Sequence, residues 1–224
     1  MSFPFGSKNS RIIYSVVSPI SGEIKVWEYQ NSRALYVGGY LQSATSGAPE
    51  FEKRYWAKAA QEIGSRAKRP KRALVIGVGG GTVLHLLSQK FPDLKIVGVE
   101  LDPEIINVAR KFFGLDEIAN LTVVVEDGAK YVGGYQKDKF DLVFIDAYLG
   151  GDYPSYFEEE KFVQKIKAML NPGGLAVFNR TSGSNLDNFR KMLERNFARI
   201  EKVKIPLPGF LGGLAGNFLY LGRK

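Results

Sequence analysis

The feature that most constrains this chain is the stretch Arg72–Thr82, RALVIGVGGGT, in which alternating glycines follow a run of apolar residues. A second apolar run, IVGVE, ends at Glu100. In α/β proteins a strand, a glycine turn, a helix and a second strand ending in an acid form a nucleoside-binding crevice. The glycines let the backbone approach the ligand, and the carboxylate accepts hydrogen bonds from a ribose diol. We therefore predict nucleoside binding by Gly77, Gly79, Gly81 and Glu100.

The glycine spacing narrows the class of nucleoside. The dinucleotide fingerprint is G-x-G-x-x-G, but this turn reads G-x-G-x-G and Thr82 occupies the later position. No G-x-x-x-x-G-K-S/T run is present, so no P-loop is expected. The short turn suits S-adenosylmethionine (AdoMet) or a relative of it, which has no pyrophosphate. A turn that binds nothing is disfavoured, because alternating glycines cost backbone entropy on folding.

Length and composition exclude several classes of protein. The 224 residues, 45% of them hydrophobic, suffice for one domain of ordinary size with a small appendage. No apolar stretch has the length of a membrane span and MSFPFGSKNS lacks an apolar signal core, so we expect a cytoplasmic protein without a membrane partner. The absence of cysteine excludes disulfides and zinc–thiolate sites. A single histidine, His85, argues against histidine metal clusters, so no metal site is predicted.

The net charge of +8 raises the alternative of a nucleic-acid partner. Much of the excess lies in Arg66–Arg72, RAKRPKR, which Pro70 marks as a charged connector after a helix. No aromatic RNA-binding strand accompanies it. We therefore favour a solvated connector over an RNA-binding surface.

Residues 1–48 are predicted to form a small antiparallel β domain, and 49–224 a transferase domain. Alternation and turn residues place the strands of the small domain at 12–17, 23–29, 34–37 and 40–42. Such a sheet is too small to be stable alone, so it should pack on the main domain or pair with a second subunit.

The second domain alternates strand and helix patterns. Its predicted strands cover 73–76, 95–99, 121–125, 140–145 and 175–178, the last after a tight turn at 171–174. Its predicted helices cover 50–63, 82–91, 103–113, 158–169 and 186–196, and a hairpin of 199–204 and 217–221 joined by a Pro/Gly loop closes the chain. The fold class is α/β, a Rossmann-like class I methyltransferase sheet that is mostly parallel with a C-terminal antiparallel hairpin.

Acidic residues follow several of the predicted strands, at the sheet edge where ligands of open parallel sheets bind. Asp102 before Pro103 has the pattern of a helix N-cap and is assigned to structure. Asp127, followed by Gly128, suits recognition of an adenine amino group. Asp146 ends the apolar run FDLVFID, where burial and a substrate would meet.

Asp146 is the candidate base. A sulfonium cofactor is already electrophilic, so catalysis is mostly alignment. An amine nucleophile must arrive neutral, and a carboxylate can orient it and accept its proton. The following segment Gly150–Glu160, GGDYPSYFEEE, is a candidate lid that attracts a cationic substrate, although Glu158–Glu160 also suit a helix N-terminus.

The chain resembles the spermidine/spermine synthase family, in its short spermidine synthase-like branch. The motifs are SGEIKVWEYQNSRALYVGGYLQS, GVGGGT, VELDPE, VEDGAKY, FDLVFIDAY, NPGGLAVFN and AGNFLYLG, over nearly the whole length. The resemblance implies that Gln42 and Tyr55 hold the thioadenosine or the amine, that Glu100 and Asp127 bind adenosine, and that Asp146 deprotonates the amine. It also implies oligomers, a homodimer or tetramer, formed through the β domain. Tyr148, beside Asp146, is a further catalytic candidate.

The chain departs from the family pattern mainly at positions where the family has acidic residues. Gly79 stands where the family has an acid that meets the amino group of decarboxylated AdoMet, and Leu149 stands where a second amine-binding acid is expected. Trp56 replaces a histidine. Glu52 or Asp152 could substitute as substrate-binding acids.

Three functions therefore remain open. The first is transfer of an aminopropyl group from decarboxylated AdoMet to a polyamine or related small-molecule amine. The second is methyl transfer from AdoMet on the same scaffold, suggested by Gly79. The third is non-catalytic binding of a nucleoside or RNA, suggested by the +8 charge.

Overall fold

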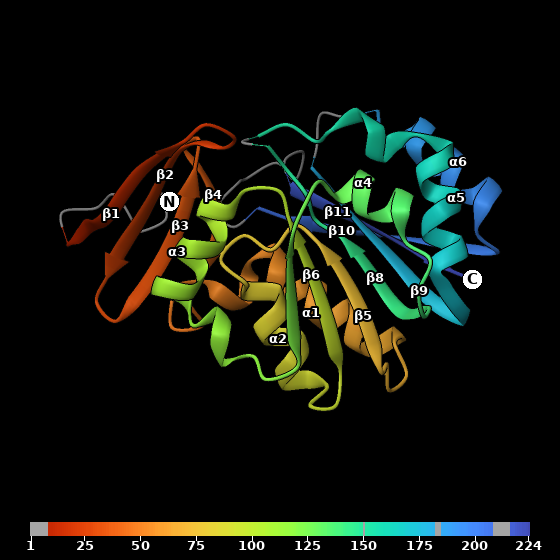
Figure 1. Ribbon diagram of the computed structural model, residues 1–224, viewed down its shortest axis with the longest axis horizontal. Helices are drawn as coiled ribbons and strands as arrows, with labels where there is room; N and C mark the ends of the chain where they lie inside the picture. The colour runs from red at the N-terminus through yellow and green to blue at the C-terminus, as the bar shows by residue number, and fades with distance from the viewer. Residues whose placement is uncertain (1–8, 150, 182–184, 208–215) are drawn as a thin grey trace.

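Two separate β-sheets form the framework of the protein, as a computed structural model shows for residues 9–149, 151–181, 185–207 and 216–224 (Figure 1). A four-stranded antiparallel sheet comes first in the chain. A seven-stranded sheet follows, parallel in its middle and closed by an antiparallel hairpin. The predicted fold class is confirmed. The predicted Pro/Gly loop of the hairpin lies mostly outside the described residues.

The small sheet consists of β1 (Ser10–Ser18), β2 (Gly22–Tyr29), β3 (Ser32–Val37) and β4 (Tyr40–Ala44), in that order. Its alternation is as predicted, with Ile24 and Val26 buried on one face. That face packs against Ile105 and Val108 of α3 (Pro103–Phe113). The small sheet is therefore stabilised by packing on the main domain, the first of the two predicted arrangements.

The large sheet has the strand order β10-β11-β9-β8-β5-β6-β7. Its strands are β5 (Arg72–Ile76), β6 (Lys95–Glu100), β7 (Leu121–Val125), β8 (Phe140–Ile145), β9 (Leu170–Thr181), β10 (Arg199–Pro206) and β11 (Gly216–Arg223). β5 has β6 on one side and β8 on the other, all parallel. The chain order thus reverses between β5 and β8, and the loops after these strands diverge to leave a crevice.

Helices cover both faces of this sheet, as Figure 1 shows. One face packs against α1 (Tyr55–Arg66) and α2 (Thr82–Lys90), and the other against α4 (Gly128–Gly134), α5 (Glu160–Met169) and α6 (Leu186–Asn196). Successive residues of β5 alternate between the two layers, Val75 facing one and Leu74 the other. Short 3₁₀ turns lie at η1 (Phe51–Lys53), η2 (Leu115–Glu117) and η3 (Ser155–Glu158).

Two local predictions were wrong and one helix was missed. The helix predicted at 50–63 is split, because Glu50 is left-handed and Arg54 is extended, so that α1 begins only at Tyr55. The residues predicted as a tight turn at 171–174 belong to β9, where Gly173 is left-handed with a φ of 75° and the register against β8 shifts. α4 was not predicted, since its glycines disfavour a helix.

Asp102 caps α3 as predicted, its side chain accepting from the Glu104 N–H at 2.9 Å. The same buried carboxylate accepts a 2.5 Å hydrogen bond from the Ser18 hydroxyl at the end of β1. This bond joins the small sheet to the helix on which it packs.

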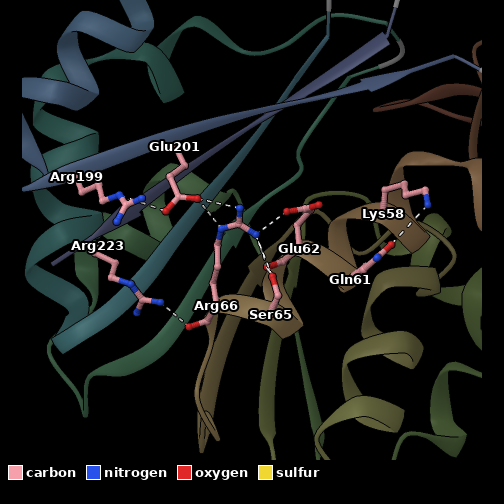
Figure 2. A network of polar contacts seen from close by, with 8 residues as sticks. All are labelled: Lys58, Gln61, Glu62, Ser65, Arg66, Arg199, Glu201 and Arg223. Carbon is pink, nitrogen blue, oxygen red and sulfur yellow. Dashed lines mark hydrogen bonds and ion pairs between the residues drawn. The ribbon is translucent and has the colours of Figure 1, made fainter.

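The C-terminal end of α1 is held by a polar network around Arg66 (Figure 2). The Arg66 guanidinium pairs with Glu62 and with Glu201 of β10, and its carbonyl accepts from Arg223 of β11 at 2.5 Å. These contacts join the C-terminal end of α1 to the closing hairpin.

The segment after β8 is held by a buried cation. Arg180, 1% exposed, forms an ion pair with Glu158 and lies over the Tyr153 ring at 3.9 Å. Phe157, in the same segment, is buried. Glu158, which belongs to the predicted substrate-attracting lid, is thus neutralised by Arg180.

Replacing Glu158 tests this pairing. Glu158→Gln would leave the buried Arg180 guanidinium without its carboxylate, and we expect the free energy of unfolding to fall by about 3 kcal/mol in urea denaturation. Adding Arg180→Met should restore most of that loss, because no buried charge remains. If Glu158→Gln were as stable as the wild type, the ion pair would contribute nothing to the free energy of unfolding.

Candidate active site

A cavity lies at the carboxyl ends of β5, β6 and β8, where the sheet order reverses. The strand ends are joined by the Gly77 N–H donating to Val99 O and the Asp146 N–H donating to Ile76 O, both at 2.8 Å. We call this the first cavity. Eight of the predicted site residues line it: Gln42, Tyr55, Gly77, Gly79, Glu100, Gly128, Asp146 and Tyr148.

Gly77 is required where the glycine turn passes Asp146. Its φ is 91°, a conformation that favours glycine, and a Cβ there would lie 2.2 Å from the Asp146 carbonyl oxygen. The glycine at this position therefore lets the glycine turn pass close to the backbone of Asp146.

Glu100 joins the end of β6 to the glycine turn. One carboxylate oxygen accepts from the N–H groups of Val78 and Gly79, at 3.0 and 3.2 Å. The other accepts from Leu101 and Asp102, at 2.9 and 3.2 Å. Burial raises the pKa of the Glu100 carboxyl, and these backbone donors oppose the rise.

Asp146 lies at the centre of a hydrogen-bonded chain. One of its oxygens accepts from the Tyr55 hydroxyl at 2.8 Å and the other from the Asn179 amide at 2.6 Å. Asn179 is positioned in turn by the Asn217 amide, which donates to its side-chain oxygen at 3.0 Å. Burial raises the pKa of the Asp146 carboxyl to about 7, while the two donors favour its charged form.

The tyrosines around Asp146 stay protonated. Burial and the Asp146 charge hold the pKa of Tyr55 well above its usual range, and raise that of Tyr148 as well. The Tyr148 hydroxyl donates to the Asn179 carbonyl at 3.1 Å. Both tyrosines therefore act as hydrogen-bond donors, and Asp146 is the ionisable group at this point.

Strand β4 of the small sheet is bonded to the glycine turn. The Gly80 N–H donates to the Ser43 hydroxyl at 2.8 Å, and the Thr82 hydroxyl donates to Ala44 O at 2.9 Å. These bonds place Gln42, which precedes them on β4, at the wall of the first cavity.

A second cavity meets the first at Asp146 and shares Gln42, Tyr55 and Tyr148 with it. It extends between the start of α1 and the closing hairpin. Its remaining lining residues are Tyr40, Leu41, Arg54, Trp56, Gly151, Asn179, Thr181, Ile205, Pro206, Leu207, Gly216 and Asn217.

Four predicted site residues do not line either cavity as described. Gly81 lies at the start of α2, facing Leu115. Asp127 caps α4 and accepts from Tyr156, whereas its neighbours Glu126 and Gly128 do line the first cavity. Glu52 and Asp152 are exposed.

Sequence reasoning missed Asn179, which touches the candidate base. The signal was a polar residue at the end of the apolar run LAVFN, at the same sheet edge as Asp146. It also missed Arg54 on the second cavity, because the start of α1 was placed too early.

Among the residues that the structure describes, no group of three acidic, histidine or cysteine side chains could hold a metal ion. His85 bonds through Nε2 to the Phe113 carbonyl at 2.9 Å, as a packed histidine.

Within the residues that the structure describes, no helix is long and apolar enough to cross a membrane.

The sheet, its closing hairpin and the glycine turn facing an acid define a class I methyltransferase-like fold. Spermidine synthase in complex with the transition-state analogue AdoDATO has this fold, with a TM-score of 0.78 and 21% identity over 96% of this chain and 74% of that one. Spermidine synthase from Thermotoga maritima has a TM-score of 0.77 and 22% identity over 96% of this chain and 73% of that one.

The family follows from the sequence comparisons. The model of the spermine/spermidine synthase domain matches residues 54–219, so the chain belongs to the spermine/spermidine synthase family and is a transferase. A polyamine aminopropyltransferase of Vibrio vulnificus is 28% identical over 91% of this chain and 71% of its own length. A polyamine aminopropyltransferase of Chromobacterium violaceum is 30% identical over 85% of this chain and 73% of its own length. The human eEF1A lysine and N-terminal methyltransferase is 32% identical, but over only 49% of this chain and 17% of its own length.

Titration of Asp146 tests the geometry of the site. We expect its carboxyl to titrate near pH 7, against about 3.9 for an exposed aspartate, so the linked stability is largest below pH 4 and is lost as the pH rises through 7. Asn179→Leu should raise the pKa further by removing a donor to the carboxylate. Carboxyl NMR of aspartate-labelled protein, with Asp146→Asn to assign the signal, measures both. Titration near pH 4 in the wild type would contradict the burial argument.

Proposed function

We propose that this protein transfers an aminopropyl group from decarboxylated AdoMet to the nitrogen of an amine acceptor. The observation that carries the proposal is the position of Asp146, where two cavities meet, with both oxygens held by Tyr55 and Asn179. Family membership and relatives named polyamine aminopropyltransferases support it, and these names point to a polyamine-type acceptor.

The proposed reaction is a displacement at carbon. The neutral amine nitrogen attacks the aminopropyl carbon bonded to the sulfonium, the new C–N bond forms, and the C–S bond breaks with its electron pair going to sulfur. The products are 5′-methylthioadenosine and the aminopropylated amine. Asp146 accepts the proton that the nitrogen loses, and a carboxyl with a pKa of about 7 is suited to this near neutral pH.

The charge of the first cavity favours the decarboxylated donor. Its described lining includes Glu100, Glu126 and Asp146 and no lysine or arginine. Decarboxylated AdoMet carries a sulfonium and an ammonium but no carboxylate, so an acidic wall favours it over AdoMet. These acids lie in the same cavity as Gly79, where the family acid is missing.

The remaining roles belong to the same proposal. Glu100 and Asp127 would bind the nucleoside, with Gly77, Gly79, Gly81 and Gly128 shaping the turn, while Gln42, Tyr55 and Tyr148 would hold the reacting groups. Glu52 and Asp152 would reach the acceptor only after rearrangement, since both are exposed. Assembly through the small sheet is supported by its exposed apolar residues, among them Val17 at 74%.

Methyl transfer from AdoMet is the second candidate, favoured by Gly79 on the cavity wall and by the partial match to a human methyltransferase. The two reactions differ in which sulfonium-bound carbon faces the acceptor. RNA binding is the third candidate and rests on the charge alone.

A competition experiment separates the candidates. The protein is given AdoMet and decarboxylated AdoMet together with a panel of amines, and the nucleoside products are identified by mass. We expect 5′-methylthioadenosine, formed only when an amine is present. S-adenosylhomocysteine would establish the methyltransferase, and retention of RNA without turnover would favour the third candidate.

Replacing the candidate base gives the second test. Asp146→Asn should lower kcat about 1000-fold, because proton acceptance is lost, while 5′-methylthioadenosine binds nearly as before. Asp93→Asn, which removes an exposed carboxylate paired with Lys71, is the matched control and should leave kcat unchanged. A near wild-type rate in Asp146→Asn would remove Asp146 from the mechanism.

Glu100→Ala tests the nucleoside role. It should weaken binding of 5′-methylthioadenosine about tenfold or more, measured by calorimetry, since the carboxylate would no longer meet the ribose diol. The effect should appear mainly in KM for the donor. Unchanged donor affinity would argue against ribose binding at this residue.

A further inference from the structure

The first cavity has two ends along the sheet. Asp146 follows β8 at one end, Glu126 and Gly128 follow β7 at the other, and Glu100 on β6 lies between them. A nucleoside whose ribose meets Glu100 and whose sulfonium faces Asp146 therefore has its base at the β7 end. Recognition of the base depends on the polar groups that this end presents.

Asp127, which the sequence suggests for recognition of the adenine amino group, lies outside the described lining of this end. One of its carboxylate oxygens accepts from the Lys130 N–H at 2.8 Å, as the cap of α4. The other oxygen accepts from the Tyr156 hydroxyl at 3.2 Å. Tyr156, unlike Asp127, does line the cavity. Of this hydrogen-bonded pair, the tyrosine is therefore the member that borders the base site.

The bond to Asp127 makes the Tyr156 hydroxyl an acceptor toward a ligand. Because a carboxylate has no hydrogen to donate, the hydroxyl hydrogen is committed to Asp127, and the phenolic oxygen keeps its lone pairs for accepting. A hydroxyl that donates to a charged group also becomes a stronger acceptor. Burial and the Asp127 charge raise the pKa of Tyr156 to about 12, so the phenol keeps its hydrogen at neutral pH.

Neighbouring side chains hold the Tyr156 ring in place. It packs edge-on against the buried Phe157 ring, with 4.4 Å between the centroids. Phe157 packs closely on Gly128, where a Cβ would lie 3.3 Å from the phenylalanine ring. The next residue, Glu158, pairs with the buried Arg180. The hydroxyl is therefore positioned before a ligand binds, which lowers the entropy lost on recognition.

We infer that Tyr156 recognises the base of the donor: its hydroxyl oxygen accepts a hydrogen bond from the exocyclic amino group of adenine. Asp127 acts through Tyr156, as a positioning residue that holds the hydroxyl hydrogen. The inference rests on the nucleoside donor of the proposed function and refines the role of Asp127 in it. A purine with an oxygen in place of the amino group would set two acceptors against each other, so the site rejects it.

The test compares two nucleosides that differ at this group of the base. 5′-Methylthioadenosine and 5′-methylthioinosine, which has an oxygen in place of the amino group, are titrated into the protein by calorimetry. We expect the wild type to bind the adenine compound about tenfold or more tightly than the other. Tyr156→Phe keeps the ring and should remove most of that preference. Tyr135→Phe removes a hydroxyl at the end of α4 that lines neither cavity, and as the matched control it should keep the preference.

Asp127→Asn tests the direction of the hydrogen bond. The asparagine oxygen can still cap α4, and its amide then donates to Tyr156, so the tyrosine hydrogen turns toward the ligand. We expect the preference to reverse in favour of 5′-methylthioinosine. Adding Tyr156→Phe should abolish the reversed preference, because no hydroxyl remains. If residue 127 contacted the base directly, the double variant would still favour 5′-methylthioinosine.

The outcomes separate this inference from the proposed function, because binding is measured without turnover. If neither nucleoside binds the wild type, the donor site of the proposed function fails, and the inference with it. If aminopropyl transfer occurs but Tyr156→Phe keeps the full preference, the transfer stands and another group, such as Glu126 or Asp127, recognises the base. If Tyr156→Phe does not fold, Asp127→Asn decides: an unreversed preference refutes the inference.

Discussion

The desolvation of one half-buried carboxylate, Asp146, at the junction of the two cavities determines how the rest of the site is built. A buried carboxylate is stable only when donors meet its oxygens, and here the donors come from distant parts of the chain. Tyr55 reaches it from the start of α1, and Asn179 from the end of β9, supported by Asn217 on β11. The closing hairpin, the central strands and the first helix therefore must take their observed relative positions for Asp146 to be satisfied.

Contacts far from Asp146 also hold the elements that carry its hydrogen-bond donors and the cavity wall. The Arg66 network holds the C-terminal end of α1 against β10 and β11 (Figure 2). Tyr55 lies at the other end of the same helix. The Ser43 hydroxyl on β4 accepts from the Gly80 N–H, so the small sheet forms a wall of the first cavity in addition to packing on α3. The proposed chemistry depends on alignment, and these contacts hold the groups that align the reactants.

The described linings of the two cavities differ in charge. The first cavity is lined by Glu100, Glu126 and Asp146, which supports the proposed cosubstrate with two positive charges, and the lining of the second includes Asp146 and Arg54. Family membership specifies the kind of reaction, while the side chains of this chain bear on which amine is used. Gly79 and Leu149 stand where the family resemblance predicts acids, so the acceptor specificity of this chain is a matter for its own side chains.

The sequence by itself determined the strands and most helices, because periodicity and glycine or proline turns are local properties. It also determined the glycine turn and the acids at the strand ends, since parallel strands bring their carboxyl ends to one edge. Only the tertiary structure decided which distant side chains meet: that Asn179 bonds Asp146, that Glu52 and Asp152 line neither cavity, and that Arg54 lines the second cavity. The physical reason is that burial and hydrogen-bond partners depend on packing between elements far apart in the chain, which no local pattern records.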